Sequence, residues 1–191
     1  MAMLQQLLEG LDVYILIEVM QNKPKECLNL FVIGDDDLVD AHYIISNLAP
    51  EMSESGSPKQ KETEIFYFFH DFLQQLDDGK VSLPVAKDSG EKEDSGEKED
   101  KGEPLSVPSV MQWLTGQAHR HLLVSEREKF KIVVIFDHSC LQHMPNHTVC
   151  YPVVSACTNT ITFPTAHLRD YDAFKSNIET AIKYGARFDR V

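Results

Sequence analysis

The sequence predicts an α+β protein in which a mostly helical N-terminal part is joined by an acidic, disordered insert to a small α/β lobe. Three observations support this prediction. Apolar residues recur at helical spacing before residue 84, a tandem acidic repeat occupies the middle, and strand-forming runs follow after residue 106. We therefore expect three parts, residues 1–83, 84–106 and 107–191, of which the second has no core of its own.

Composition and charge limit the function classes. The 191 residues are 42% hydrophobic, which is ordinary for a globular protein, and the net charge of −12 argues against binding to a nucleic acid. No apolar run approaches the roughly 20 residues that a membrane span needs, and the acidic N-terminus does not resemble a signal peptide. We therefore expect a cytoplasmic or nuclear protein that binds no membrane and keeps its four cysteines reduced.

The first 50 residues show three helical patterns. A first helix is expected over Leu4–Met20, weakened or kinked at Gly10, and a second over Lys25–Val32. A third, Leu38–Asn47, follows the acidic triplet Asp35–Asp37. We interpret the triplet as negative charge at a helix N-terminus rather than as a metal site, because consecutive carboxylates point in different directions on a helix.

The clearest helix is Glu62–Leu76, where apolar side chains line one face and Asp77–Gly79 ends the pattern. Such a stripe predicts core packing, with docking into a partner's groove as the alternative.

The segment Asp88–Glu103 reads DSGEKE, DSGEKE, DKGE. Because it contains no large apolar residue, it predicts a disordered linker.

The second half of the chain contains both helix-like and strand-like apolar patterns. Val107–Leu114 predicts a short helix closed by Gly116, and Lys129–Phe136 is a continuous apolar strand of the kind that is buried on both faces. The last helix is expected to begin at Arg169–Asp170 and to end at Gly185. With the stretch described next, the order is helix, strand, two short strands and helix, which is that of a small α/β lobe.

The most informative stretch is Tyr151–Pro164, YPVVSACTNTITFP. β-Branched and aromatic residues on both sides of the run Ser155–Cys157 predict two short strands joined by a tight loop. Small neighbours leave the Cys157 thiol accessible, whereas a core cysteine is surrounded by large apolar side chains. Cys157 is therefore a candidate nucleophile that can form a covalent bond to a large substrate.

This stretch resembles the catalytic loop of the HECT-type ubiquitin ligases, whose pattern is Leu-Pro-x-Ala-x-Thr-Cys-x-Asn-x-Leu-x-Leu-Pro. Six positions agree in register: Pro152, Cys157, Asn159, Ile161, Phe163 and Pro164. Three positions depart from the pattern, with Tyr151, Val154 and Ala156 in place of the family's leucine, alanine and threonine.

The resemblance extends over most of the chain. Met111–Gly116 and Phe130–Phe136 are similar to the family's Leu-x-Phe-x-Thr-Gly segment and to the strand after it. Gln5–Leu11 and Ile65–Leu76 resemble the closing part of its N-terminal lobe. Phe188 is fourth from the end, where the family carries a phenylalanine that activity requires. The chain thus resembles a divergent, shortened HECT domain.

The resemblance implies a ubiquitin-protein transferase that accepts ubiquitin from a conjugating enzyme on Cys157, as a thioester, and passes it to a lysine of a protein substrate. Thr158 and Asn159 would hold the loop, Phe188 would dock the tail, and Asp189 would help to deprotonate the lysine. Thioester exchange is nearly balanced in energy, so no strong general base beside the cysteine is needed. No cofactor or metal is expected.

In this interpretation residues 1–83 are a remnant of the N-terminal lobe and residues 107–191 are the HECT C-terminal lobe. The family's conjugating enzyme docks on an earlier part of the N-terminal lobe, so we expect weak recruitment by this chain. The alternative function is a truncated, catalytically weak HECT-like protein that binds ubiquitin or another partner without transferring it.

The loop before Tyr151 offers a rival site, because the spacing of four of its side chains could hold zinc tetrahedrally: Cys140, His143, His147 and Cys150. Pro145 interrupts this loop, and the ligand order differs from that of the common zinc knuckles. The HECT family has no zinc here. The sequence therefore favours a variable loop with incidental thiols.

Overall fold

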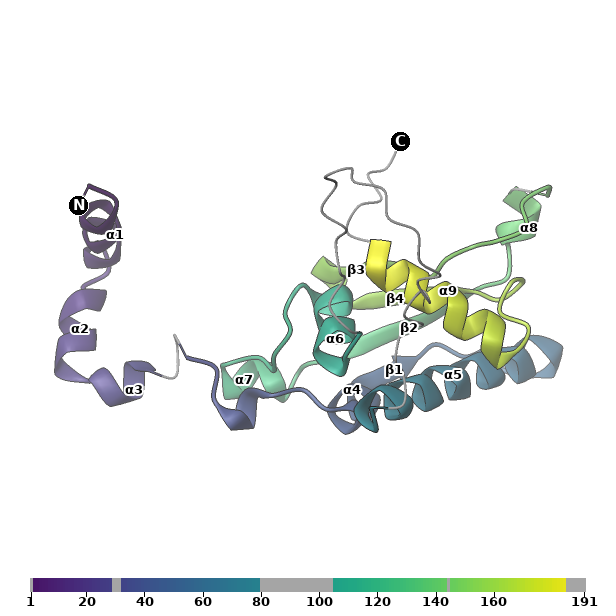
Figure 1. Cartoon of the computed structure of the whole chain (residues 1–191), viewed down its shortest axis with the longest axis horizontal. Coiled ribbons are helices and arrows are strands. Elements are labelled where there is room, and N and C mark those ends of the chain that lie inside the picture. The colour runs from purple at the N-terminus through teal and green to yellow at the C-terminus, as the bar shows by residue number, and fades with distance from the viewer. Residues whose placement is uncertain (1, 29–31, 80–104, 144, 185–191) are drawn as a thin grey trace, which may run out of the picture. The chain divides into compact units, whose positions relative to one another are not determined.

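The computed structural model describes residues 2–28, 32–79, 105–143 and 145–184, and Figure 1 shows the course of the chain. The chain forms two compact units, one of residues 1–38 and 119–129 and the other of residues 39–118 and 130–191. The repeat Asp88–Glu103, the predicted helix end at Gly185, and the tail residues Phe188 and Asp189 lie outside the described residues. None of the described helices combines the length and the apolar character that crossing a membrane requires.

The division into units differs from the expected one. We expected residues 1–83 and 107–191 to form separate parts on either side of the acidic insert. Instead, β1 (Leu48–Pro50) pairs with β2 (Ile132–Asp137), and α5 (Gly56–Asp77) contributes to the same core as residues beyond 105. Helical periodicity indicates which face of a helix is buried but not which segment covers that face. The sequence pattern therefore could not reveal that α5 packs with residues beyond 105.

The smaller unit consists of short helices: α1 (Ala2–Asp12), α2 (Leu16–Asn22), α3 (Pro24–Leu28), the 3-10 helix η1 (Asp35–Asp37) and α7 (Val124–Arg127). The helix α1 runs through Gly10 without interruption. The break in the expected long helix lies instead before α2, where Ile15 has a φ of 59°. Positive φ is unfavourable for a β-branched residue, so this turn is strained.

The acidic triplet Asp35–Asp37 forms η1, so its predicted place at an α-helix N-terminus is wrong. The Asp37 carboxylate accepts a hydrogen bond from the backbone N–H of Gly34 at 3.0 Å and forms an ion pair with Arg127. The Gly34 hydrogen bond and then Arg127 lower the pKa of Asp37. The N-cap of the next helix, α4 (Ala41–Asn47), is Asp40, whose Oδ1 accepts a hydrogen bond from its first turn.

The larger unit is built on a four-stranded mixed sheet with the strand order β1-β2-β4-β3. The strand β4 (Thr160–Pro164) is parallel to β2 and antiparallel to β3 (Val153–Ser155), and β1 is parallel to β2. Both strands predicted around the cysteine are thus confirmed. The sheet and the nine α-helices of the described ranges confirm the α+β class.

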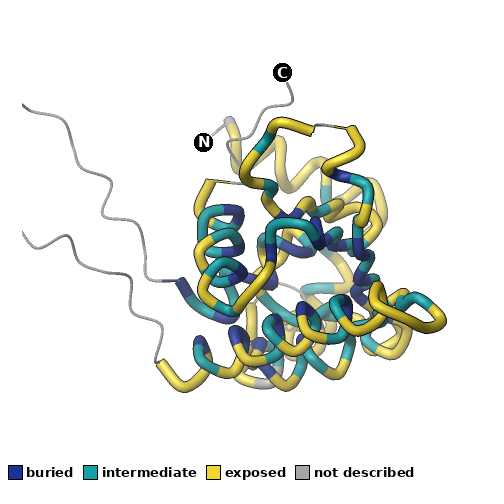
Figure 2. The backbone as a smooth tube through the Cα atoms, turned by 90° about the vertical axis from the view of Figure 1, so that its right-hand side faces the viewer, coloured by how far each residue is buried: buried dark blue, intermediate teal, exposed yellow. Residues whose placement is uncertain are grey.

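The core lies on one face of this sheet, against α5, α6 (Val107–Thr115) and α9 (Tyr171–Tyr184). At its centre Phe163 of β4 contacts Phe69 of α5 and Phe174 of α9, with ring centroids 5.4 and 5.7 Å apart. In Figure 2 the buried stretches of the backbone lie toward the interior and the exposed stretches toward the outside.

Burial along β2 alternates. Ile132, Val134 and Phe136 are buried, whereas Val133 and Ile135 between them are only partly buried. The prediction that this strand is buried on both faces is therefore wrong. A continuous apolar run also occurs on a strand whose second face is only partly covered.

Two predicted helices are confirmed. The apolar stripe of Glu62–Leu76 lies in the core, which decides in favour of core packing over a partner's groove. The helix α6 begins after its N-cap Ser106 and ends at Gly116, whose φ of 80° suits glycine. Leu105 is buried, so the fold resumes before the predicted end of the insert at residue 106.

A buried polar network connects α5 to the ends of β2 and β4. Glu62, only 2% exposed, accepts hydrogen bonds from the Ser53 backbone N–H and hydroxyl, both at 2.6 Å. Its Oε1 also lies 2.7 Å from His138 Nε2, and the other His138 ring nitrogen lies 3.1 Å from the Thr165 hydroxyl. Burial raises the pKa of Glu62, but the hydrogen bonds from Ser53 and His138 outweigh it, and the net pKa is lowered.

We predict that Glu62→Gln lowers the free energy of unfolding at pH 7 by about 1–3 kcal/mol, because the network loses charge-assisted hydrogen bonds in a buried place. Urea unfolding followed by circular dichroism measures the change. Since the folded pKa of Glu62 lies below its ordinary 4.5, its contribution is complete above that pH and is lost as the pH falls below it.

The acid dependence should therefore be weaker in Glu62→Gln than in the wild type. Glu64→Gln is the matched control, because Glu64 is exposed on the same helix. Equal effects of the two substitutions would contradict a structural role of the network.

Candidate functional site

Cys157 lies at the tip of the β3–β4 hairpin, in the 3-10 helix η2 (Ala156–Thr158). It is exposed, as are its neighbours Ser155, Ala156 and Thr158. The hairpin closes directly below, where Ser155 pairs with Thr160. The small residues around the thiol thus leave it open to solvent, as the sequence predicts.

Backbone and hydroxyl hydrogen bonds hold the turn around Cys157. The Thr158 hydroxyl donates to the Ser155 carbonyl at 3.3 Å, and the Asn159 N–H donates to the Ala156 carbonyl at 3.4 Å. The Asn159 carbonyl in turn accepts a hydrogen bond from the Val133 N–H of β2 at 2.9 Å. The turn that carries the thiol is therefore tied to a central strand.

Asn159 has a left-handed backbone, with φ of 48° and ψ of 49°. Asparagine tolerates this region better than other residues with a side chain, because its short amide bonds locally. This conformation ends η2 and turns the chain into β4. The need for a left-handed backbone at this position accounts for an asparagine two residues after the cysteine.

Within the part of the chain that the structure describes, the Cys157 thiol makes no hydrogen bond or ion pair that would identify a general base. Chemistry at this site therefore suits a nucleophile whose reaction needs access and placement rather than strong activation. Phe188 and Asp189, the other two predicted site residues, lie outside the described residues, so their roles remain predictions.

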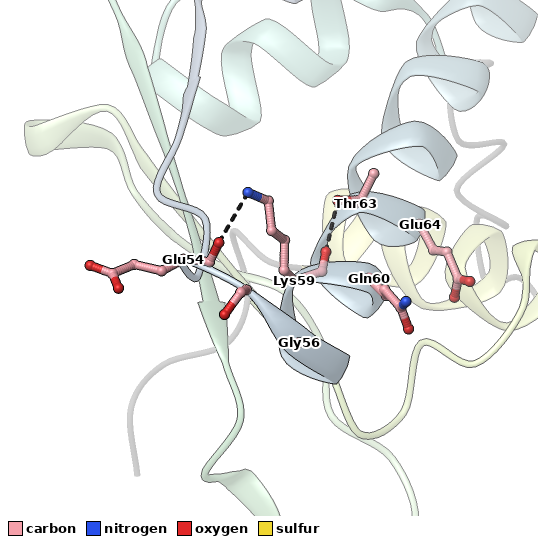
Figure 3. A pocket seen from close by; sticks show the side chains of 7 residues that line it. Glu54, Gly56, Lys59, Gln60, Thr63 and Glu64 are labelled. Atoms are coloured by element: carbon pink, nitrogen blue, oxygen red, sulfur yellow. Dashed lines mark hydrogen bonds between the residues drawn. The ribbon is translucent and has the colours of Figure 1, made fainter.

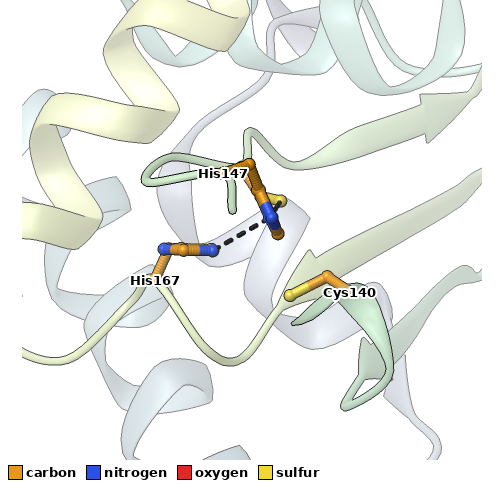
Figure 4. A group of neighbouring side chains, drawn as sticks. Cys140, His147 and His167 are labelled. Atoms are coloured by element: carbon orange, nitrogen blue, oxygen red, sulfur yellow. Dashed lines mark hydrogen bonds between the residues drawn. The ribbon is translucent and has the colours of Figure 1, made fainter. Parts of the chain in front are cut away.

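A second group of reactive side chains lies in the same unit, and we call it the Cys-His cluster: Cys140, His147, Cys150 and His167. One donor atom from each residue lies within 4.8 Å of those of the other three. The His147 and His167 Nε2 atoms are 3.0 Å apart, and His147 Nε2 is 2.6 Å from Cys150 Sγ. Figure 4 shows side chains from separate segments converging on one point.

The cluster differs from the ligand set that the sequence spacing suggests. His143 ends the short helix α8 (Cys140–His143), is exposed, and does not belong to the cluster. His167, which follows β4, takes its place. Sequence spacing did not reveal His167, because it lies 17 residues after Cys150 and beyond the whole hairpin.

The environment of the cluster shifts the pKa values of two of its side chains, Cys150 and His167. Burial, followed by the neighbouring Cys140, raises the pKa of the Cys150 thiol to about 11. Burial and then the neighbouring His147 lower the pKa of His167. In the absence of a bound cation, the thiol form of Cys150 and the neutral imidazole of His167 are therefore favoured.

An open hollow of about 620 Å³ lies at the start of α5 (Figure 3). Lys59 Nζ donates to the backbone carbonyl of Glu54 at 3.2 Å, and the Thr63 hydroxyl donates to the carbonyl of Lys59 at 2.7 Å. The carboxylates of Glu54 and Glu64 point apart. No reactive set converges there, so we assign it no site.

Comparisons of the chain with protein-family models, with curated proteins and with solved structures find no match. The functional assignment therefore depends on the residues and their geometry.

We predict that Asn159→Val lowers the free energy of unfolding by about 1–2 kcal/mol, because valine is strained in the left-handed region. Asn159→Gly is the matched control and should change it by less than about 1 kcal/mol, since glycine adopts this conformation without strain. Chemical denaturation measures both. Equal losses would show that the amide side chain, rather than the backbone conformation, matters at this position.

Proposed function

We propose that this protein is a HECT-type ubiquitin-protein transferase that works through a thioester at Cys157. The observation that supports it most is the placement of Cys157: an exposed thiol at the tip of a short hairpin, within a stretch that agrees in register with the HECT loop. The finer fold assignment, a HECT C-terminal lobe that includes residues 107–191, belongs to the same proposal.

The proposed reaction has two steps. In the first, the Cys157 thiolate attacks the thioester carbonyl between ubiquitin and the cysteine of a conjugating enzyme, and that cysteine leaves as a thiolate. In the second, the amine of a substrate lysine attacks the new thioester, forms an amide bond, gives up a proton, and releases Cys157. No oxidant, metal or cofactor takes part.

Exposure at the hairpin tip suits this chemistry, because both reaction partners are proteins and neither could enter a deep pocket. The hydrogen bonds of Thr158 and Asn159 support their proposed role in holding the loop. Phe188 docking and lysine deprotonation by Asp189 remain parts of the proposal that derive from the resemblance. The reaction would take place in the cytoplasm or nucleus, where cysteines stay reduced.

We predict that incubation with activating enzyme, a conjugating enzyme and ubiquitin gives a ubiquitin adduct that thiol reductants remove. Cys157→Ala should abolish the adduct, and Cys157→Ser should abolish it or leave a reductant-resistant ester, because an oxygen ester resists thiols. Non-reducing gel electrophoresis and intact-protein mass spectrometry measure both species. Cys27→Ser is the matched control, because Cys27 is buried in the smaller unit.

An adduct that survives Cys157→Ala would contradict the assignment. A protein that binds ubiquitin but forms no adduct with any of a panel of conjugating enzymes would support the alternative, a binding module without transfer.

A further inference from the structure

The Cys-His cluster carries an inference that is independent of ubiquitin transfer. We propose that its four side chains bind one zinc ion and that this ion fastens the loop before β3 to the ends of β2 and β4: Cys140, His147, Cys150 and His167.

The donor set is that of a structural zinc site. Two sulfurs and two imidazole nitrogens form a common closed tetrahedral set, in which bonds of about 2.3 Å to sulfur and 2.0–2.1 Å to nitrogen place the donors about 3.3–3.8 Å apart. The four donor atoms lie within 4.8 Å of one another, and two of the separations are 2.6 and 3.0 Å. One ion can therefore reach all four after shifts of about 1 Å.

The sheet register explains why these residues meet. Asp137 at the end of β2 pairs with Pro164 at the end of β4, and the two strands are parallel. Cys140 and His167 each come three residues after these paired positions, so they leave the sheet at the same edge. Cys150 comes three residues before β3, whose first residue pairs with Thr162 in the middle of β4. Because β3 is antiparallel to β4, the chain before β3 lies on the side toward which β4 ends.

Further contacts fix the ligand-bearing segments. The Asp137 carboxylate accepts hydrogen bonds from the Ser139 N–H and hydroxyl, at 2.7 and 2.6 Å, directly before Cys140. The Asn177 amide of α9 lies 3.5 Å from the Cys150 carbonyl. Outer contacts of this kind commonly orient zinc ligands.

The competing interpretation is a redox pair formed by Cys140 and Cys150. Both cysteines are free in the structure. A disulfide would use the two sulfurs and would leave unexplained why the His147 and His167 rings turn their Nε2 atoms toward each other, with His147 Nε2 also against Cys150 Sγ. Four protein donors leave no open position on a tetrahedral ion, so the site would be structural rather than catalytic.

The position of the ion gives it a mechanical role. The cluster lies at the open end of the β3–β4 hairpin, and Cys157 lies at its tip. An ion there would join the 138–150 loop to the segment after β4 and would fix the hairpin from the end opposite to the exposed thiol.

The test measures zinc in the full-length protein after expression in zinc-supplemented medium and dialysis against metal-free buffer. Elemental analysis should give one zinc per chain. His167→Ala should weaken binding by more than the roughly 10- to 100-fold that losing an outer contact costs. His143→Ala is the matched control, because His143 is a nearby exposed histidine outside the cluster, and it should bind zinc as the wild type does.

Two further measurements keep the test decisive if His167→Ala folds poorly. His167→Cys should retain one zinc, since three cysteines and one histidine also form a zinc site. Cobalt added to the metal-free wild type should give the intense visible absorption of tetrahedral thiolate coordination, and His147→Ala should weaken it.

Less than one-tenth of a zinc per chain in the wild type, about equal zinc in wild type and His167→Ala, or a Cys140–Cys150 disulfide in the non-reduced protein would each overturn the proposal. None of these readouts depends on ubiquitin, so failure of the proposed transfer activity leaves them interpretable.

Discussion

The parallel pairing of β2 with β4 is the constraint on which the rest of the larger unit depends. Its register runs from Val133 opposite Thr160 to Asp137 opposite Pro164. At one end, the Val133 N–H holds the Asn159 carbonyl and thereby the turn that carries Cys157. At the other end, the same register makes the segments after β2 and β4 leave the sheet side by side, and both lead into the Cys-His cluster. Because side chains alternate along a strand, a slip of one residue would turn Phe163 out of the core and would separate both sites at once.

Local features could be predicted from the sequence, and long-range pairing could not. The strands around Cys157, the core face of α5, and α6 with its glycine end all depend on residues close together in the chain, so periodicity and turn chemistry sufficed. The strand β1 is only three residues long and showed no alternation, and its pairing with β2 crosses more than 80 positions. Because of that pairing, the segments before and after the acidic insert belong to one compact unit rather than to two. His167 was missed for the same reason, since only the register brings it to Cys140.

The two ends of the hairpin place cysteines in opposite physical environments. Cys157 is exposed among small residues on a turn, where other molecules can reach its sulfur from solvent. Cys150 is partly buried beside Cys140, and this neighbourhood raises its pKa to about 11. An isolated thiol in the second environment is a poor nucleophile, but a cation changes the balance, because a coordinating thiol is deprotonated by the metal itself. Residue type therefore says little about a cysteine's role, and its surroundings decide between reaction with a partner and the binding of an ion.

The proposed role of Cys157, an exposed nucleophile for protein-sized substrates, would create a mechanical problem. Packing cannot hold a thiol that must remain open, and ordering a backbone costs about 1–2 kcal/mol per residue. In this structure the turn is fixed by the hydrogen bond of the Thr158 hydroxyl, by the left-handed backbone of Asn159 and by the hydrogen bond from the Val133 N–H to the Asn159 carbonyl. The hairpin beneath it has a strand β3 of only three residues, so its open end needs support as well. The connection from β2 to β3 is long and runs through the cluster residues, and a bound ion would shorten its effective length to the spans between ligands. Rigidity at the tip would then come from both ends of the hairpin, while the surface around Cys157 stays open to solvent.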